Sequence, residues 1–142
     1  MTFQHVLVAT DFSDCSARAL ELGVALAERF DATLTLVHTW QVPVSSYGAA
    51  LYLPGDLASV IEAAALAQLA ATGEAVKVRV PRVVTTLRQG EAWQEILAAA
   101  ESAHADLIVV GTHGRQGLTR ALLGSVAEKV VRLASVPVLS VH

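Results

Sequence analysis

Cysteine is scarce in this sequence, with Cys15 as the single example among 142 residues. One cysteine cannot form a disulfide within the chain, and this usage fits a reducing compartment. Charge is also sparse, because charged residues make up 16% of the chain and the net charge is −3. A surface that binds nucleic acid normally carries a basic patch. The composition therefore argues against nucleic acid as a partner.

Apolar runs of membrane-spanning length are missing as well, although hydrophobic residues make up 54% of the chain. A membrane-spanning helix needs about 20 consecutive apolar residues, so we expect no membrane span. The first residues, from Met1 to His5, lack the positive charge and the cleavage site of a signal peptide. We therefore expect a cytoplasmic protein that forms a single domain over residues 1–142.

Short apolar runs alternate with helical patterns along the chain. Short runs of mostly apolar or β-branched residues predict strands at residues 6–9 (extended by His5 and Thr10), 33–37, 83–87, 107–110 and 137–141. Apolar residues at helical spacing predict helices at residues 14–30, 57–69, 91–103 and 125–133. The second helix is expected to begin at a cap near Asp56 and to end near Gly73. Residues 39–56 are expected to form a long loop. Residues 76–82 are ambiguous, and we interpret them as a lead-in or an edge segment because Pro81 interrupts their alternation.

Strands that alternate with helices predict an α/β fold, in which a doubly wound parallel sheet carries helices on both faces. A flavodoxin-like order of strands is one arrangement that satisfies this rule. No internal repeat or linker divides the chain.

Glycines gather where the fourth predicted strand ends. Gly111 closes the strand, Gly114 and Gly117 follow, and Gly124 precedes Ser125 at the start of a helical pattern. Glycine lets the backbone approach an anion closely, and the start of a helix offers unpaired N–H groups. Ser125 adds a hydroxyl donor. The stretch therefore predicts a phosphate site.

Two common phosphate motifs do not fit this stretch. A Walker A loop needs a lysine after its last glycine, whereas Gly124 is followed by Ser125 and Val126. The dinucleotide fingerprint needs a second glycine two positions after the first, whereas Gly111 is followed by Thr112 and His113. The observed spacing is G-x2-G-x9-G-S.

This spacing resembles the ATP-binding signature of the universal stress protein family. The resemblance covers nearly the whole chain, from the strand that leads into Asp11 to the final Val-Pro-Val-Leu. It implies a Rossmann-like sheet of five strands in the order 3-2-1-4-5. In this order the first and fourth strands are neighbours at the topological switch point, so Asp11 and Gly111 would meet at one crevice.

The resemblance also implies roles for individual residues. Together with the loop positions themselves, it predicts that the residues binding ATP are Asp11, Val37, Gly111, Gly114, Arg115, Gly124, Ser125 and Val126. Asp11 would help to hold Mg²⁺ or Mn²⁺, or it would simply cap the first helix. Val37 would meet the adenine through its main chain, and Val126 would donate a backbone N–H. Arg115 and His113 lie within the loop, and each would either touch a phosphate or be an exposed, solvated side chain.

Three functions are open at this point. The first is an ATP-binding stress-response or signalling module, and the second is a slow ATPase or nucleotidyl transferase that uses the same site. The third is a structural dimer without a ligand. The missing Walker lysine and the absence of paired carboxylates near the loop argue against catalysis.

The last predicted strand, from Pro137 to Val141, is an edge strand in the implied order. It has no charged residue, and only His142 follows it. Unprotected edges favour pairing with another chain, and the family resemblance implies dimerisation through the final strand. We therefore expect a homodimer.

Overall fold

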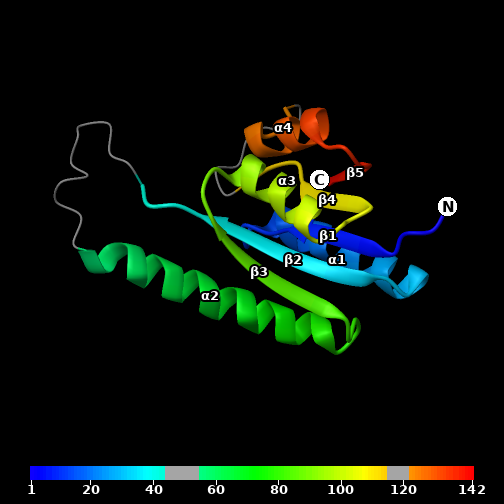
Figure 1. The fold of residues 1–142 in the computed structure, drawn as a ribbon, viewed down its shortest axis with the longest axis horizontal. Coiled ribbons are helices and arrows are strands. Elements are labelled where there is room, and N and C mark those ends of the chain that lie inside the picture. Colours follow the sequence, from blue (N-terminus) through cyan, green and yellow to red (C-terminus); the bar gives the residue numbers. More distant parts are fainter. Residues whose placement is uncertain (44–54, 115–121) are drawn as a thin grey trace.

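The computed structural model describes residues 1–43, 55–114 and 122–142 (Figure 1). Its elements, in chain order, are β1 (His5–Ala9), α1 (Asp14–Phe30), β2 (Thr33–Trp40), α2 (Gly55–Lys77), β3 (Val83–Gln89), α3 (Ala92–Ser102), β4 (Leu107–Gly111), α4 (Ser125–Leu133) and β5 (Val138–Val141). All nine predicted elements are therefore found. The central part of the predicted loop, residues 44–54, lies outside the described residues.

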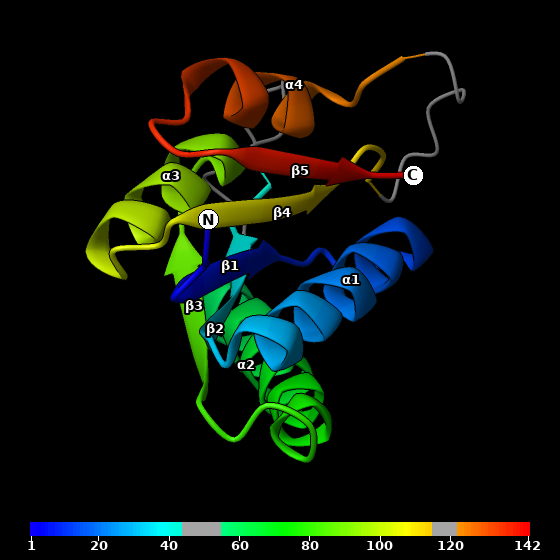
Figure 2. The same ribbon diagram turned by 90° about the vertical axis from the view of Figure 1, so that its right-hand side faces the viewer.

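The strands form one parallel sheet in the order β3-β2-β1-β4-β5, which confirms the expected fold. Figures 1 and 2 show helices on both of its faces. Helices α1 and α2 cover one face, where Val8, Leu36 and Val109 are buried. Helices α3 and α4 cover the other face, where Leu7, Val37 and Ile108 are buried. Strands β1, β2 and β4 are thus buried on both sides, as their mostly apolar or β-branched sequences predict.

Helix α2 is longer than the sequence pattern predicts, because it continues through Gly73 to Lys77. Gly73 is buried, and a Cβ at this position would lie 2.4 Å from Thr85 Cγ2 on β3. The glycine therefore permits close packing of the helix on the sheet and does not end the helix. Val76 belongs to the segment that is ambiguous in sequence, and it is the last buried residue of α2.

Strand β2 also continues further than predicted. It pairs with β3 as far as Trp40, which lies opposite Gln89. Thr39 and Trp40, expected in the loop, therefore belong to the sheet. Since β1 ends at Ala9, the last residues of β2 extend past the end of its other neighbour.

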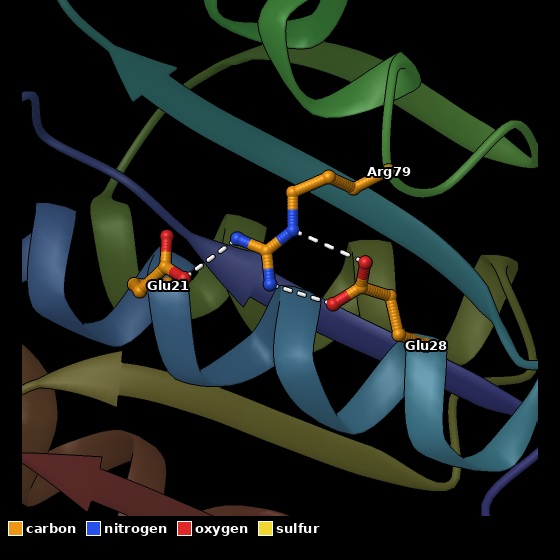
Figure 3. Close-up of polar contacts among 3 residues, drawn as sticks. All are labelled: Glu21, Glu28 and Arg79. Atoms are coloured by element: carbon orange, nitrogen blue, oxygen red, sulfur yellow. Dashed lines mark hydrogen bonds and ion pairs between the residues drawn. The ribbon is translucent and has the colours of Figure 1, made fainter.

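Helix α1 is fixed at both ends. Ser13 caps its start by accepting a hydrogen bond from Ser16 N–H (3.2 Å), and Asp31 ends it in a left-handed conformation (φ 54°). Arg79, in the turn after α2, bonds to both Glu21 and Glu28 on α1 (Figure 3). The hydrogen bond from Arg79 lowers the pKa of the Glu28 carboxyl, and the two carboxylates raise the pKa of Arg79.

The two edges of the sheet differ in charge. β3 carries Arg88, and Arg82 precedes it, whereas β5 has no charged side chain between Val138 and Val141. Among the described residues, we find no helix that combines the length and the apolar character needed to cross a membrane.

Candidate functional site

A cavity of about 330 Å³ opens at the carboxyl ends of the strands. It lies where β1 and β4 are neighbours and their connections leave in opposite directions, which is the place where doubly wound sheets bind ligands. Seven residues predicted from the sequence line it: Asp11, Val37, Gly111, Gly114, Gly124, Ser125 and Val126. Residues more than a hundred positions apart are thus brought together.

The lining of the cavity has an apolar part and a polar part. Apolar side chains come from Ala9 and Val110 of the sheet and from Ala92 and Ile96 of α3. The polar part consists of Asp11, the segment after β4 and the start of α4. Such a division suits a ligand with a flat, weakly polar group at one end and an anionic group at the other.

Asp11 lies directly against the glycine segment. Its Oδ1 accepts a hydrogen bond from Ser13 N–H (3.0 Å) and another from the Ser13 hydroxyl. A Cβ at Gly114 would lie 3.0 Å from Asp11 Oδ2. Because Ser13 provides the cap of α1, the alternative that Asp11 caps this helix is wrong. Asp11 instead forms a turn before the cap and presents its carboxylate to the segment after β4.

Two other glycines permit close packing of the backbone around the cavity. A Cβ at Gly111 would lie 3.1 Å from the Cys15 carbonyl carbon, so the end of β4 can approach α1 only without a side chain there. A Cβ at Gly124 would lie 2.9 Å from Thr112 O. The glycine spacing therefore also has a packing reason.

The start of α4 faces the cavity through Ser125, Val126 and Ala127. Gly124 is the N-cap residue, and no side chain caps this helix. Gly124 N–H donates to Thr112 O (2.7 Å), which holds the helix start against the end of β4. The first N–H groups of a helix lack partners within the helix, so this end of α4 is suited to an anion.

The main chain of Val37 is already engaged in the sheet. Its carbonyl accepts a hydrogen bond from Thr10 N–H (2.9 Å), and its side chain is fully buried. Peptide groups two residues apart on a strand face the same side, so the peptide of Thr39 faces the same side beyond the end of β1. Thr39 also lines the cavity, although the sequence prediction did not include it.

Comparison with known proteins identifies the family. The model of the universal stress protein family matches residues 2–142. The chain belongs to the universal stress protein family. Universal stress protein YxiE of Bacillus subtilis is 35% identical over 147 residues, which cover 99% of this chain and 99% of the relative.

Solved structures of universal stress proteins have the same fold. The protein UspA from Lactobacillus plantarum superposes with a TM-score of 0.86 at 24% identity, covering 100% of this chain and 99% of the other. A universal stress protein in complex with cAMP superposes with a TM-score of 0.73 at 28% identity, covering 100% and 98% of the two chains. One solved universal stress protein of this fold therefore holds a nucleotide.

Some of the predicted ligand contacts lie beyond what the structure describes. Arg115 falls in the segment 115–121, outside the described residues. Within the described ranges, no group of three or more histidine, cysteine or acidic residues is arranged to hold a metal ion. Asp11 is the one carboxylate among the described residues that line the cavity of this universal stress protein.

Sequence analysis missed several residues of the lining. Thr112 is buried and forms part of the cavity wall, while Ala92 and Ile96 come from α3. Thr112 lay within the glycine motif, whose spacing drew attention to its glycines alone. Ala92 and Ile96 carry no recognisable signal, since they fit the apolar face of an ordinary helix.

Proposed function

We propose that this universal stress protein binds ATP together with a divalent cation, and acts as a nucleotide-responsive stress-response or signalling module rather than as a catalyst. The observation that carries the proposal is the cavity in which an apolar wall adjoins a glycine-lined segment and the open start of α4. The related structure in complex with cAMP supports an adenine nucleotide as the ligand class.

The apolar part of the cavity would hold the base. Ala9, Val110 and Ile96 offer flat apolar surface, and a purine gains from such burial. The main chain of Thr39 is better placed than that of Val37 to bond the edge of the base, because the Val37 carbonyl already accepts from Thr10. We therefore assign the main-chain contact to Thr39, with Val37 as part of the wall.

The polar part would hold the phosphates. Main-chain N–H groups at Val126 and Ala127 lie at the start of α4, where the helix dipole favours negative charge. Gly114 leaves room beside the Asp11 carboxylate. Ser125 adds a hydroxyl donor, and Arg115 remains a predicted phosphate contact.

A divalent cation would offset the charge repulsion between the Asp11 carboxylate and the phosphates. Two negative groups in one cavity repel each other unless a cation lies between them. Mg²⁺ is commonly held by one or two carboxylates together with substrate phosphates and water, so a single carboxylate suffices. Asp11 would hold Mg²⁺ or Mn²⁺, and the ion would supply charge neutralisation.

Thermal unfolding with ATP and Mg²⁺ tests the binding proposal. A ligand present at a hundredfold its Kd stabilises the folded state by about 2.7 kcal/mol, which raises the melting temperature by roughly 5–10 °C. Gly114→Val should abolish this rise, because its side chain would occupy the space beside the Asp11 carboxylate.

The matched control is Ser135→Val, which adds the same side chain at an exposed position before β5, at the opposite end of the strands. It should leave the rise with ATP intact. A wild-type protein whose melting temperature does not change at millimolar ATP would overturn the proposal.

The edge strand β5 supports a second part of the proposal, namely a homodimer. β5 pairs with β4 on one side only, and it has no charge to discourage another strand. Two copies related by a two-fold axis would pair their β5 strands in antiparallel fashion. We also place the protein in the cytoplasm, since the buried thiol of Cys15 suits a reducing compartment.

A further inference from the structure

Thr10 and Ser16 are buried hydroxyl residues in the cavity wall to which the proposed binding mode gives no role. Their exposed fractions are 7% and 4%, and both line the cavity. Thr10 follows β1 directly, and Ser16 lies in the first turn of α1. Their hydroxyl oxygens, which we call the hydroxyl pair, are 3.2 Å apart. The pair therefore joins the two ends of the turn between β1 and α1.

The main chain of Thr10 is fixed by the neighbouring strand β2. Its N–H donates to Val37 O (2.9 Å). Its carbonyl oxygen lies 2.7 Å from Nδ1 of His38, and this ring nitrogen is the donor because a carbonyl oxygen only accepts. The hydroxyl of Thr10 therefore extends from a backbone position that β2 holds through both of its polar groups.

The hydroxyl pair is also bonded to the turn itself. Thr10 Oγ1 accepts a hydrogen bond from Phe12 N–H (3.0 Å), and Ser16 Oγ donates to Ser13 O (3.0 Å). Phe12 has a φ of 63°, in the left-handed region that a bulky residue rarely adopts. Such a conformation persists only where surrounding contacts hold it. The pair thus provides side-chain bonds on both sides of the strained residue.

The path of this turn determines the shape of one wall of the cavity. Thr10, Asp11 and Ser16 all line the cavity, and the strained Phe12 directly follows Asp11. If Phe12 relaxed to an ordinary conformation, the wall on the β1 side would move. A ligand that fits the cavity as it stands would then lose contacts along this wall.

We propose that the hydroxyl pair of Thr10 and Ser16 positions the turn between β1 and α1 for nucleotide binding, by holding Phe12 in its left-handed conformation. Thr10 and Ser16 are then positioning residues that act through the turn, and Thr10 has the larger effect because it bonds Phe12 directly. This inference rests on the proposed function and adds to it two residues that set the affinity of the site for its nucleotide.

Titration calorimetry with ATP and Mg²⁺ tests the role of the pair. Thr10→Val keeps the shape of the side chain and removes the acceptor of Phe12 N–H. Since one hydrogen bond is worth about fivefold in an equilibrium constant, Thr10→Val should weaken ATP binding by about this factor. Thr10→Ser keeps the hydroxyl and should bind ATP like the wild type. Ser16→Ala should weaken binding less, and it should add no further loss to Thr10→Val, because the two residues act as one unit.

A suppressor variant tests the connection to Phe12. Glycine adopts a positive φ without strain, so the turn should depend less on the hydroxyl in a Phe12→Gly background. There we expect Thr10→Val to weaken ATP binding by less than about twofold, against about fivefold when Phe12 is present. A threonine that contributed only to the general stability of the fold would cause the same loss in both backgrounds.

Thr35→Val is the matched control. Thr35 is also a buried threonine of this sheet, with an exposed fraction of 3%, and its hydroxyl contacts His5 Nε2 (2.7 Å) outside the cavity lining. The variant removes a comparable hydrogen bond, so it should lower the melting temperature and leave the affinity for ATP unchanged. An equal loss of affinity in Thr35→Val and Thr10→Val would overturn the inference, because binding would then follow the stability of the whole fold.

The outcomes separate this inference from the proposed function. A wild type that does not bind ATP would overturn the proposed function and, with it, the inference. A wild type that binds ATP, with Thr10→Val and Ser16→Ala variants that bind it equally well, would overturn the inference alone. Equal losses from Thr10→Val with and without Phe12→Gly would also overturn it, since the conformation of Phe12 would then play no part.

Discussion

Phe12 adopts a backbone conformation that is uncommon for a bulky residue. Its φ is 63°, in the left-handed region, and it lies between Asp11 and the cap residue Ser13. Its N–H donates to Thr10 Oγ1 (3.0 Å), and its ring lies 4.5 Å from the ring of His38. Such strain costs about 1–3 kcal/mol and persists only where surrounding contacts hold it. Here these contacts fix the turn that presents the Asp11 carboxylate to the cavity.

His5 gives a pH dependence to the stability of the fold. Burial lowers the pKa of His5, opposed by Asp106 and aided by His104, and His5 Nε2 contacts Thr35 Oγ1 (2.7 Å). With a folded pKa below the unfolded value of about 6.5, the unfolded chain binds more protons on acidification. The contribution of His5 to the stability of the fold is therefore complete above the unfolded pKa. It is lost as the pH falls through the lowered pKa of the folded state.

We expect the melting temperature to fall on acidification from pH 8 to pH 5, and to fall less steeply in His5→Gln. Glutamine can still bond Thr35 but does not titrate. The measurement is a series of thermal melts on both proteins across this range. Identical slopes for the two proteins would show that His5 does not contribute.

Catalysis is expected to be slow or absent. Asp11 is the one carboxylate in the described lining, and the sequence has no Walker lysine, so the described lining offers neither a pair of carboxylates nor the lysine of a P-loop enzyme. Steady-state phosphate release from ATP should remain close to the buffer blank in the wild type. A robust rate that disappears in Asp11→Ala would contradict this expectation and support the enzyme alternative.

The part of the candidate site that residue spacing indicates could be predicted from the sequence. The glycines and Ser125 were found because turns and helix starts need particular residue types, and Asp11 because it ends a strand. The main-chain contact at Val37 was less predictable, because neighbouring peptides on a strand face opposite sides. Only the observed bond between Thr10 N–H and Val37 O shows which peptides face the cavity.

At the scale of elements, Arg79 connects the turn after α2 to α1 (Figure 3). Its ion pairs to Glu21 and Glu28 are short (2.6 Å each) but exposed, and exposed pairs contribute little to stability. Arg79→Met should therefore lower the melting temperature only slightly at low salt. The difference should vanish at 1 M salt, where charges are screened within about 3 Å.

Arg132→Met is the matched control, because Arg132 pairs with Glu128 inside α4 and connects no two elements. Thermal melts at low and high salt compare the two variants. A loss for Arg79→Met that persists at 1 M salt would assign its contribution to packing of the side-chain stem.

The elements themselves were largely predictable, since buried strands and amphipathic helices leave clear patterns. Helix α4 was predicted with its observed bounds, because Ser125 begins and Leu133 ends a periodic stretch. The predicted end of α2 was wrong because a glycine inside a helix and a glycine after a helix cannot be distinguished in the sequence. Packing of Gly73 against Thr85 distinguishes them, and that contact is tertiary.

At the scale of the whole molecule, the register of β5 shows how its pairing can be tested. Ile108 N–H donates to Pro137 O, and Thr112 N–H donates to Val141 O. Because alternate peptides of a strand face opposite sides, the peptide of Leu139 faces β4, like those of Pro137 and Val141. The peptides of Val138 and Ser140 face the open edge.

We expect the wild type to be a dimer by light scattering and Ser140→Pro to be a folded monomer, since proline removes an outward N–H. Leu139→Pro is the contrasting variant, because it removes an inward N–H and should destabilise the fold itself. Circular dichroism distinguishes the two effects. A wild-type monomer at micromolar concentration would refute the dimer. A Ser140→Pro variant that remains dimeric would show that the interface lies elsewhere.

The unequal edges of the sheet also limit how far such an assembly can grow. In the proposed pair, the two β5 strands would pair with each other at the centre. The continuous sheet would then end in a β3 strand on either side. Arg88 lies on β3 and Arg82 just before it, and charged residues discourage further strand addition. In the proposed pair, the charged β3 edges would therefore disfavour the addition of a third copy, and growth of the sheet would stop at two subunits.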